Sequence, residues 1–322
     1  MHRKNIALRS KSLLLECGAN FLGCSGHVQK AFRLIEQTKN TYGLDLELLI
    51  YTRSEELAHT NLDVGGQYLD IVNINRLFKV LNENGLNFNL ALNGSPDFYK
   101  HVPLDLKEMN LLEDLCRSGV VAGLRNSVTI ADDALLPTIR QEFPELDMIA
   151  SCISPSYAPN IIDYRRQAAK CSDEGELLIS YYNYLYKNYD KVVPVVQLAN
   201  PIFLKELKLP PSMIATKTIT FLNLFCGSIN LGRCTRHYAG FNNEIEPNMP
   251  IIPEHLMSQK EGLRIDEAIS TCTMATDSIK LINRPNDLRA MLKMGINQFK
   301  IPARDSHTQD DFRLLCELMM FS

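Results

Sequence analysis

The sequence lacks the features that mark membrane-spanning and secreted chains. Its longest apolar runs are far below the roughly 20 residues that span a bilayer, so no transmembrane helix is expected. Near the start, the leucine run at residues 13–15 stops at Glu16, short of the roughly 7 apolar residues of a signal-peptide core. We therefore expect a cytoplasmic protein with no membrane partner.

An excess of charge of one sign is also absent. The chain carries 34 Lys and Arg residues against 37 Asp and Glu, for a formal net charge of −3. A protein that contacts many phosphates normally carries a basic stripe, and the sequence shows none. We expect a small-molecule substrate rather than nucleic acid, and a protein partner stays an open alternative.

Low-complexity tracts, charge blocks and close repeats are missing as well, and glycine and proline are scattered rather than pooled in a linker. What is present is the composition of an ordinary globular protein, with 45% hydrophobic and 22% charged residues in a chain of 322. Such a chain can bury a sizeable core. Its length allows one large domain or two of ordinary size. Because no linker is evident, we expect one domain over residues 1–322.

Apolar, β-branched stretches alternate with segments of helical periodicity, and this alternation is typical of βα units and a parallel sheet. The expected strands are residues 12–17, 46–51, 87–92, 120–124, 147–152, 191–196, 218–225, 278–282 and 297–301. The expected helices are residues 27–42, 68–82, 132–143, 201–207 and 287–294, with one or two more in residues 160–189. Asn286 and Asp287 form the expected start of the helix at residues 287–294, and Gly295 follows its end. The pattern predicts an α/β fold with a single (β/α) TIM-like barrel, either regular or distorted. An open doubly wound sheet is the alternative.

In either architecture, functional groups gather beyond the carboxyl ends of the strands. Three thiols fall there, because Cys17 ends the first expected strand, Cys24 follows it, and Cys152 ends the fifth. Arg125 follows the fourth expected strand. These positions make the ends of the strands the place to look for chemistry.

The densest group of chemically active side chains lies in residues 223–238, directly after an expected strand. Cys226, Cys234 and His237 form a Cys-x7-Cys-x2-His pattern there. Thiolate and imidazole groups are ligands of zinc and of iron–sulfur centres. Cys272, just before another expected strand, is placed to reach the same site. The alternative is structural, because a cysteine is often simply a small buried hydrophobic residue.

Other catalytic patterns are absent. The chain has no Gly-x-Gly-x-x-Gly, P-loop, His-Glu-x-x-His or Gly-x-Ser-x-Gly motif. Cys116 and Cys316 lie in apolar helical patterns, and we expect them in the core. Asp132 and Asp133 are interpreted as charges at the start of a helix.

In residues 221–234 an expected strand leads to a cysteine and then to Gly-Arg-Cys. This segment is similar to the cluster-binding segment of the collagenase-like peptidase family, a barrel family that includes oxygen-independent hydroxylases of tRNA, ribosomal RNA and ubiquinone precursors. Residues 286–304 resemble its helix-Gly-strand unit, which ends in Lys-Ile-Glu-Gly-Arg. The chain departs from that pattern at Pro302 and Ala303, and it lacks the family's opening Pro-Ala-Gly turn.

The resemblance implies a four-iron four-sulfur cluster held by four cysteines, which we expect at the carboxyl-end mouth of the barrel. Zinc is the alternative metal, because thiolate and imidazole ligands suit it as well. Cys226 and Cys234 map directly onto cluster ligands, and Cys272 maps by its position. The implied fourth ligand is Cys17, Cys24, Cys152 or His237. Asn223, at the start of the same segment, is a candidate cofactor-binding residue.

The leading hypothesis from the sequence is an iron–sulfur or other metal-dependent enzyme, resembling oxygen-independent hydroxylases, that acts on a small metabolite. Guanidinium and ammonium groups suit a carboxylate or phosphate on such a substrate. The candidate catalytic groups are Arg233, Arg236, Lys300 and Arg304, and Arg125 is a further candidate for the same anion-binding pocket. The alternatives are a metal-independent hydrolase or peptidase-like barrel, and a non-catalytic subunit of the same fold.

Overall fold

The structure, a computed structural model, describes residues 11–18, 27–52, 54, 56–57, 69–92, 102–154, 174–195, 197–222, 253–258, 280–301 and 308–320. The strands are β1 (Lys11–Gly18), β2 (Leu44–Thr52), β3 (Asn87–Leu92), β4 (Ser127–Ile130), β5 (Asp147–Ala150), β6 (Lys191–Val192), β7 (Thr220–Phe221) and β8 (Gln298–Ile301). The helices are α1 (His27–Tyr42), α2 (Ile71–Glu83), α3 (Leu106–Ala122), α4 (Leu136–Glu142), α7 (Glu174–Asn188), α8 (Pro201–Glu206), α9 (Pro211–Lys217), α10 (Pro285–Lys293) and α11 (Thr308–Met320). Short 3-10 turns are η2 (Asp133–Leu135), η4 (Glu254–Leu256) and η6 (Leu281–Asn283).

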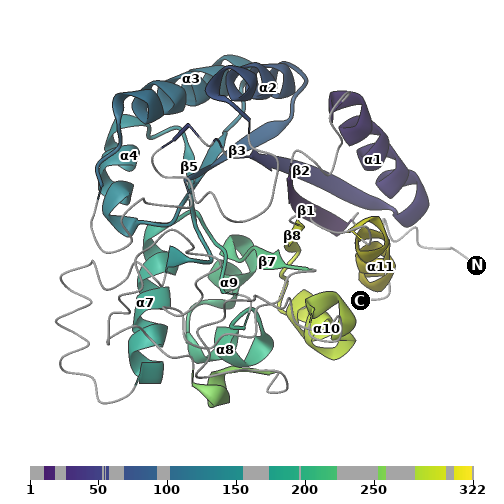
Figure 1. The fold of residues 1–322 in the computed structure, drawn as a ribbon. Coiled ribbons are helices and arrows are strands. Elements are labelled where there is room, and N and C mark those ends of the chain that lie inside the picture. Colours follow the sequence, from purple (N-terminus) through teal and green to yellow (C-terminus); the bar gives the residue numbers. More distant parts are fainter. Residues whose placement is uncertain are drawn as a thin grey trace, which may run out of the picture.

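The strands form one eight-stranded sheet in the order β6-β5-β4-β3-β2-β1-β8-β7, and every ladder in it is parallel. The sheet curls into a half-barrel (Figure 1). From β1 the strands follow in chain order on one side, and β8 and β7 lie on the other. The α/β class and the parallel sheet of the sequence prediction are confirmed, and the order is the cyclic one of a barrel rather than that of a doubly wound sheet with a switch point.

The two edge strands of the sheet, β6 and β7, share no ladder. A single parallel bridge links Val192 to Thr218, and the backbone N–H of Ile219 donates to the carbonyl of Val192 at 2.9 Å. The described part of the sheet is therefore an open half-barrel whose edges touch at one point.

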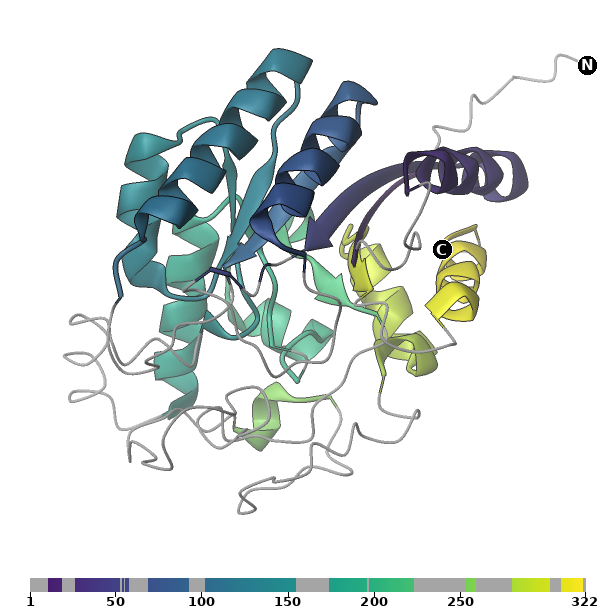
Figure 2. The same cartoon turned by 45° about the horizontal axis from the view of Figure 1, so that its top comes forward.

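Helices cover the outer face of the sheet, where most of the core lies (Figures 1 and 2). Alternate residues of the strands point to opposite faces, so Leu13, Leu15 and Cys17 of β1 are buried on the helix side. The inner face carries a smaller apolar cluster. Its members are Leu49, Ile149, Val193, Ile219 and Phe221, with Leu14 and Cys152 packed against them. Burial on both faces explains why these strands read as nearly continuous apolar runs.

Local sequence signals fix the ends of the helices. At the start of α3, the Asp105 side chain accepts from the Glu108 backbone N–H while Glu108 bonds back to Asp105, a complete capping box. The helix ends at Gly123, whose φ of 69° is in the left-handed region that favours glycine. The same device ends α10, where Gly295 has a φ of +85°.

Two expected strands are wrong. The apolar run at residues 120–124 is the end of α3 and the turn after it, and Val121 is 84% exposed. The strand in this part of the chain is β4, a few residues later. The segment expected as a strand at 278–282 contains the 3-10 turn η6 in its described part. In both cases a short apolar run satisfied the strand pattern without belonging to the sheet.

The start of the last expected helix is also corrected. The cap of α10 is Arg284 with Pro285 at the first turn, so Asn286 and Asp287 lie inside the helix. Proline suits that position because the backbone N–H groups of a first turn have no acceptor within the helix, so the absence of an N–H costs no hydrogen bond. Among the described residues, no helix is long and apolar enough to cross a bilayer.

Candidate functional site on the inner face

A buried ion pair lies on the inner face of the sheet. Glu16 of β1 and Lys300 of β8 are register partners, and the Lys300 Nζ lies 2.5 Å from the Glu16 Oε1. Their side chains are 0% and 6% exposed, respectively. Glu16 is the sixth of the eight residues of β1, so the pair sits in the carboxyl half of that strand.

Neutral polar side chains from the next strands surround the carboxylate. The Asn89 Nδ2 of β3 donates to the Glu16 Oε1 at 2.9 Å and to the Thr129 Oγ1 of β4 at 2.8 Å. The second carboxylate oxygen, Glu16 Oε2, is buried and has no hydrogen-bond partner among the described residues. A buried carboxylate oxygen without a donor is costly, so this position destabilises the fold unless another group supplies a donor.

Aromatic rings flank the ammonium. The Lys300 Nζ lies 4.2 Å from the centroid of the Tyr51 ring on β2 and 5.8 Å from that of Phe221 on β7. Both distances fit cation–π attraction. We call Glu16, Tyr51, Asn89, Thr129 and Lys300 the inner-face cluster.

The surroundings keep Lys300 protonated. Burial by itself lowers the pKa of the Lys300 ammonium, but the Glu16 charge, the Tyr51 and Cys152 side chains and the hydrogen bond to Glu16 outweigh it, so the pKa ends above its ordinary value. An amine that attacks a carbonyl must first be neutral. Lys300 is therefore a cation and hydrogen-bond donor in this arrangement, not a ready nucleophile.

The described cysteines occupy different faces of the sheet. Cys152 lies just beyond β5, packs against the apolar residues of the inner face and is close enough to Lys300 to influence its pKa. Cys17 is buried in the core on the helix side, where burial and the nearby Glu16 charge raise the pKa of its thiol. A thiolate ligand at the carboxyl end of the inner face can thus come from Cys152, whereas Cys17 points away from it.

Cys116 and Cys316 behave as predicted. Cys316 is fully buried in the core on the helix side, and Cys116 is half-buried and packs against the same core. Burial is also the largest cause of the raised pKa of each thiol.

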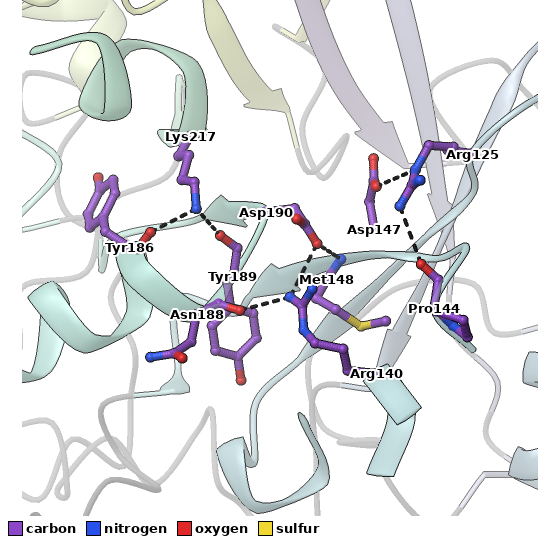
Figure 3. A network of polar contacts seen from close by, with 10 residues as sticks. All are labelled: Arg125, Arg140, Pro144, Asp147, Met148, Tyr186, Asn188, Tyr189, Asp190 and Lys217. Carbon is purple, nitrogen blue, oxygen red and sulfur yellow. Dashed lines mark hydrogen bonds and ion pairs between the residues drawn. The ribbon is translucent and has the colours of Figure 1, made fainter. Parts of the chain in front are cut away.

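Arg125 does not lie near Lys300, contrary to the expectation of a shared anion pocket. It precedes β4, and its Nε donates to the Asp147 Oδ1 at 2.8 Å at the amino end of β5 (Figure 3). Its neighbours in the figure serve the same end of the sheet: the Arg140 Nη2 donates to the Asn188 carbonyl at 2.8 Å. The cause of the error is the misplaced fourth strand, because Arg125 would follow a strand only if residues 120–124 formed one. Arg125 belongs to a network that joins loops at the amino ends.

The remaining predicted site residues lie outside the described residues. They are Asn223, Cys226, Arg233, Cys234, Arg236, His237, Cys272 and Arg304, together with Cys24. Within the described ranges, no group of three or more His, Cys, Asp or Glu side chains could hold a metal ion. Lys300 is the predicted catalytic residue that the structure places, and it lies in the inner-face cluster.

Sequence reasoning missed the partners of Lys300. Glu16, Asn89 and Thr129 each interrupt a buried strand with a polar side chain on the face opposite the helix-side core. A polar residue at alternate positions of a fully buried strand is the signal that could have found them, because such strands are otherwise apolar.

Two further buried carboxyl groups, those of Asp132 and Asp133, lie just beyond β4. Asp132 accepts from the backbone N–H of Ala134, as predicted for a charge at a helix start. Asp133, however, is buried and accepts hydrogen bonds from the hydroxyls of Tyr181 and Tyr189 on the α7 side. Burial raises the pKa of Asp133 to about 7, although the two tyrosine bonds act in the opposite direction.

No protein-family model and no curated protein matches this chain. The resemblance to the collagenase-like peptidase family therefore stays a prediction from the sequence. The position, burial and charge of the inner-face cluster bear on function independently of that resemblance.

Proposed function

We propose that the protein is a (β/α)-barrel enzyme that acts on a small metabolite at the carboxyl ends of its strands. The observation that carries the proposal is the ion pair of Glu16 and Lys300, buried on the inner face. Barrel enzymes place their catalytic groups at the carboxyl ends of the strands, and five strands of this sheet contribute to the inner-face cluster there.

The energetics of the pair favour a functional role over a structural one. Taking two charges out of water costs several kcal/mol per ion, so a buried ion pair is often no more stabilising than well-packed apolar residues. Apolar residues already fill the inner face beside it. A charged pair lies among them, and the Glu16 Oε2 has no donor among the described residues; an unsatisfied buried oxygen of this kind supports a site that a ligand completes.

The complete barrel is part of the same proposal. The bridge from Val192 to Thr218 lies where β6 and β7 would join, and the Lys191 Nζ spans the same seam, donating to the carbonyl of Thr216 at 3.0 Å and to the side chain of Gln298. These contacts support closure of the half-barrel between its edge strands.

A thiolate-bound metal or iron–sulfur cluster also stays in the proposal. Cys226, Cys234 and Cys272 would hold it, with Cys152 or His237 as a further ligand. Cys152 fits because it borders the inner face, and Cys17 does not fit because it faces the helices. A bound cluster would supply electron transfer for the oxygen insertion that the resemblance implies, and Asn223, Arg233, Arg236 and Arg304 would complete the site.

The inner-face cluster would bind the substrate and stabilise charge on it. Lys300, held as a cation by Glu16, would donate hydrogen bonds to a substrate oxygen and stabilise negative charge that develops there. Asn89 holds the Glu16 carboxylate in place through its 2.9 Å hydrogen bond. The flanking rings exclude water from the ammonium.

The test is purification without oxygen, followed by measurement of iron, zinc and acid-labile sulfide. The variants are Cys226→Ala, Cys234→Ala and Cys152→Ala, with Cys116→Ala on α3 as the matched control. Iron with equal sulfide, lost in the first two variants and kept in the control, supports a cluster enzyme. Loss in Cys152→Ala assigns it as a ligand.

Other outcomes select the alternatives. Zinc alone would favour a hydrolase or a structural metal site. No metal in a well-folded protein after reconstitution would exclude the metal-dependent mechanism, and it would leave a metal-independent hydrolase or a non-catalytic subunit. Lys300→Met distinguishes these two alternatives. It should abolish turnover in a metal-independent hydrolase, and it should leave partner binding unchanged in a non-catalytic subunit.

A further inference from the structure

We propose that Glu16 and Lys300 together bind an uncharged ligand group that carries a hydrogen-bond acceptor beside a donor, of the carboxamide type. The Lys300 ammonium would donate a hydrogen bond to the acceptor of the ligand, and Glu16 Oε2 would accept one from its donor. This inference names the substrate class of the active site proposed above and rests on that site.

The hydrogen-bonding capacity of the pair is only partly used. An ammonium has three donors, and among the described residues the polar partner of the Lys300 Nζ is Glu16 Oε1. On the carboxylate, Oε1 accepts from both Asn89 and Lys300, while Oε2 is buried and receives no hydrogen bond from the part of the chain that the structure describes. A donor and an acceptor therefore remain side by side, in the pattern that a carboxamide complements with its C=O and N–H.

Charge selects the class of ligand. Glu16 and Lys300 cancel each other, and the side chains of Asn89 and Thr129 beside them are neutral. An anion or a cation placed against this buried pair would bring an uncompensated charge into a region of low dielectric, which is costly. The pair thus disfavours the carboxylate or phosphate that Lys300 alone would attract, and this changes the role predicted for Lys300 from the sequence.

The rings suggest the shape of a suitable probe. Tyr51 and Phe221 lie against the ammonium, so a planar apolar body next to the amide would find aromatic surface. Benzamide, benzoate and benzamidine share one ring and one size. They differ in charge and in whether they offer an acceptor and a donor, acceptors only, or donors only.

The experiment measures the affinity of the intact protein for these three compounds by ligand-observed NMR titration. It is done near pH 6.5, where thiols and phenols of ordinary acidity are uncharged. We expect benzamide to bind at least about tenfold more tightly than either charged analogue, because neither can pair with both groups without adding charge. Equal or tighter binding of benzoate, or no binding of any of the three, would overturn the proposal.

Two variants test whether the pair itself sets the preference. Glu16→Gln leaves the ammonium without its counter-charge and should shift the preference to benzoate. Lys300→Met leaves the carboxylate and should shift it to benzamidine. Arg125→Ala, at the amino end of the sheet, is the matched control and should keep the ranking of the wild type. A ranking that does not change in either charge variant would place binding elsewhere.

The ranking in the wild-type protein decides the question even if a variant fails to fold, which circular dichroism would reveal. It is independent of the metal analysis as well. Bound metal without selective benzamide binding would refute this inference and leave the proposed enzyme standing. Selective benzamide binding without metal would support this inference and refute the metal-dependent mechanism.

Discussion

The buried carboxyl group of Asp133 should make the stability of the protein depend on pH. Its pKa is raised from 3.8 to about 7, chiefly by burial. Between these two values the folded protein holds a proton that the unfolded chain has lost, so the contribution of Asp133 to stability is fully present below about pH 4 and is lost as pH rises through about 7. A difference of about three pKa units at 1.36 kcal/mol each gives an upper estimate of about 4 kcal/mol.

The assay is urea unfolding of the wild type and Asp133→Asn at intervals from pH 5 to pH 8. Subtracting the two free energies of unfolding removes the other titrating groups and leaves the contribution of Asp133. We expect the wild type to lose about 2 kcal/mol relative to the variant between pH 5 and 7, and little more above pH 8. Asp114→Asn, on α3, serves as the control and should run parallel to the wild type.

The opposite slope would refute the reasoning. The hydroxyls of Tyr181 and Tyr189 both donate to Asp133, and such bonds stabilise the charged form. If they outweighed burial, the pKa would be lowered, and the wild type would gain stability relative to Asp133→Asn as pH rises. The measurement thus decides which of two opposing effects dominates in this buried triad.

Four further predictions concern stability, each measured by urea unfolding. Glu16→Gln should cost about 3 to 5 kcal/mol because it leaves the Lys300 ammonium buried without a counter-charge, whereas the double variant Glu16→Leu/Lys300→Met should be close to the wild type. Arg125→Ala removes an ion pair with an exposed arginine and should cost less than about 1 kcal/mol. Asn126→Ala should cost about 3 kcal/mol, because its buried amide bonds to two backbone groups and to another asparagine. Lys191→Met should cost about 1 to 3 kcal/mol through lost hydrogen bonds across the edge of the sheet; no loss there would mean that this seam is not stabilising.

The parts of the fold that the sequence predicts well are those in which pattern and capping agree. The expected helix at residues 27–42 has the bounds of α1, and the expected strand at 87–92 has those of β3. Residues 120–124 mislead because Val120, Val121 and Leu124 imitate a buried strand at the exposed end of a helix. Nothing in that local run reports that Asn126, just beyond it, is fixed by four buried hydrogen bonds at the start of β4.

The candidate site is predictable only in part, for a topological reason. Lys300 could be proposed from its place on the last strand, but its partner Glu16 is 284 residues away in the chain. The pairing follows from the neighbouring positions of β1 and β8, a consequence of curling the sheet rather than of any spacing in the sequence. Asn89 and Thr129 join the cluster in the same way, from strands that are separated by a whole helix.

The two inner-face lysines differ in how the sheet compensates their charge. Lys191, at the amino end, donates to neutral acceptors, the Thr216 carbonyl and the Gln298 amide, and burial lowers the pKa of its ammonium. Lys300, toward the carboxyl end, has instead a buried carboxylate whose second oxygen has no donor among the described residues. Lys191 is partly exposed, and the charges of Glu47, Asp147 and Asp190 act on its pKa without a direct ion pair among the described residues. The carboxylate opposite Lys300 is better explained by a ligand that completes it, because the pair alone leaves a buried polar atom unsatisfied at a cost in stability.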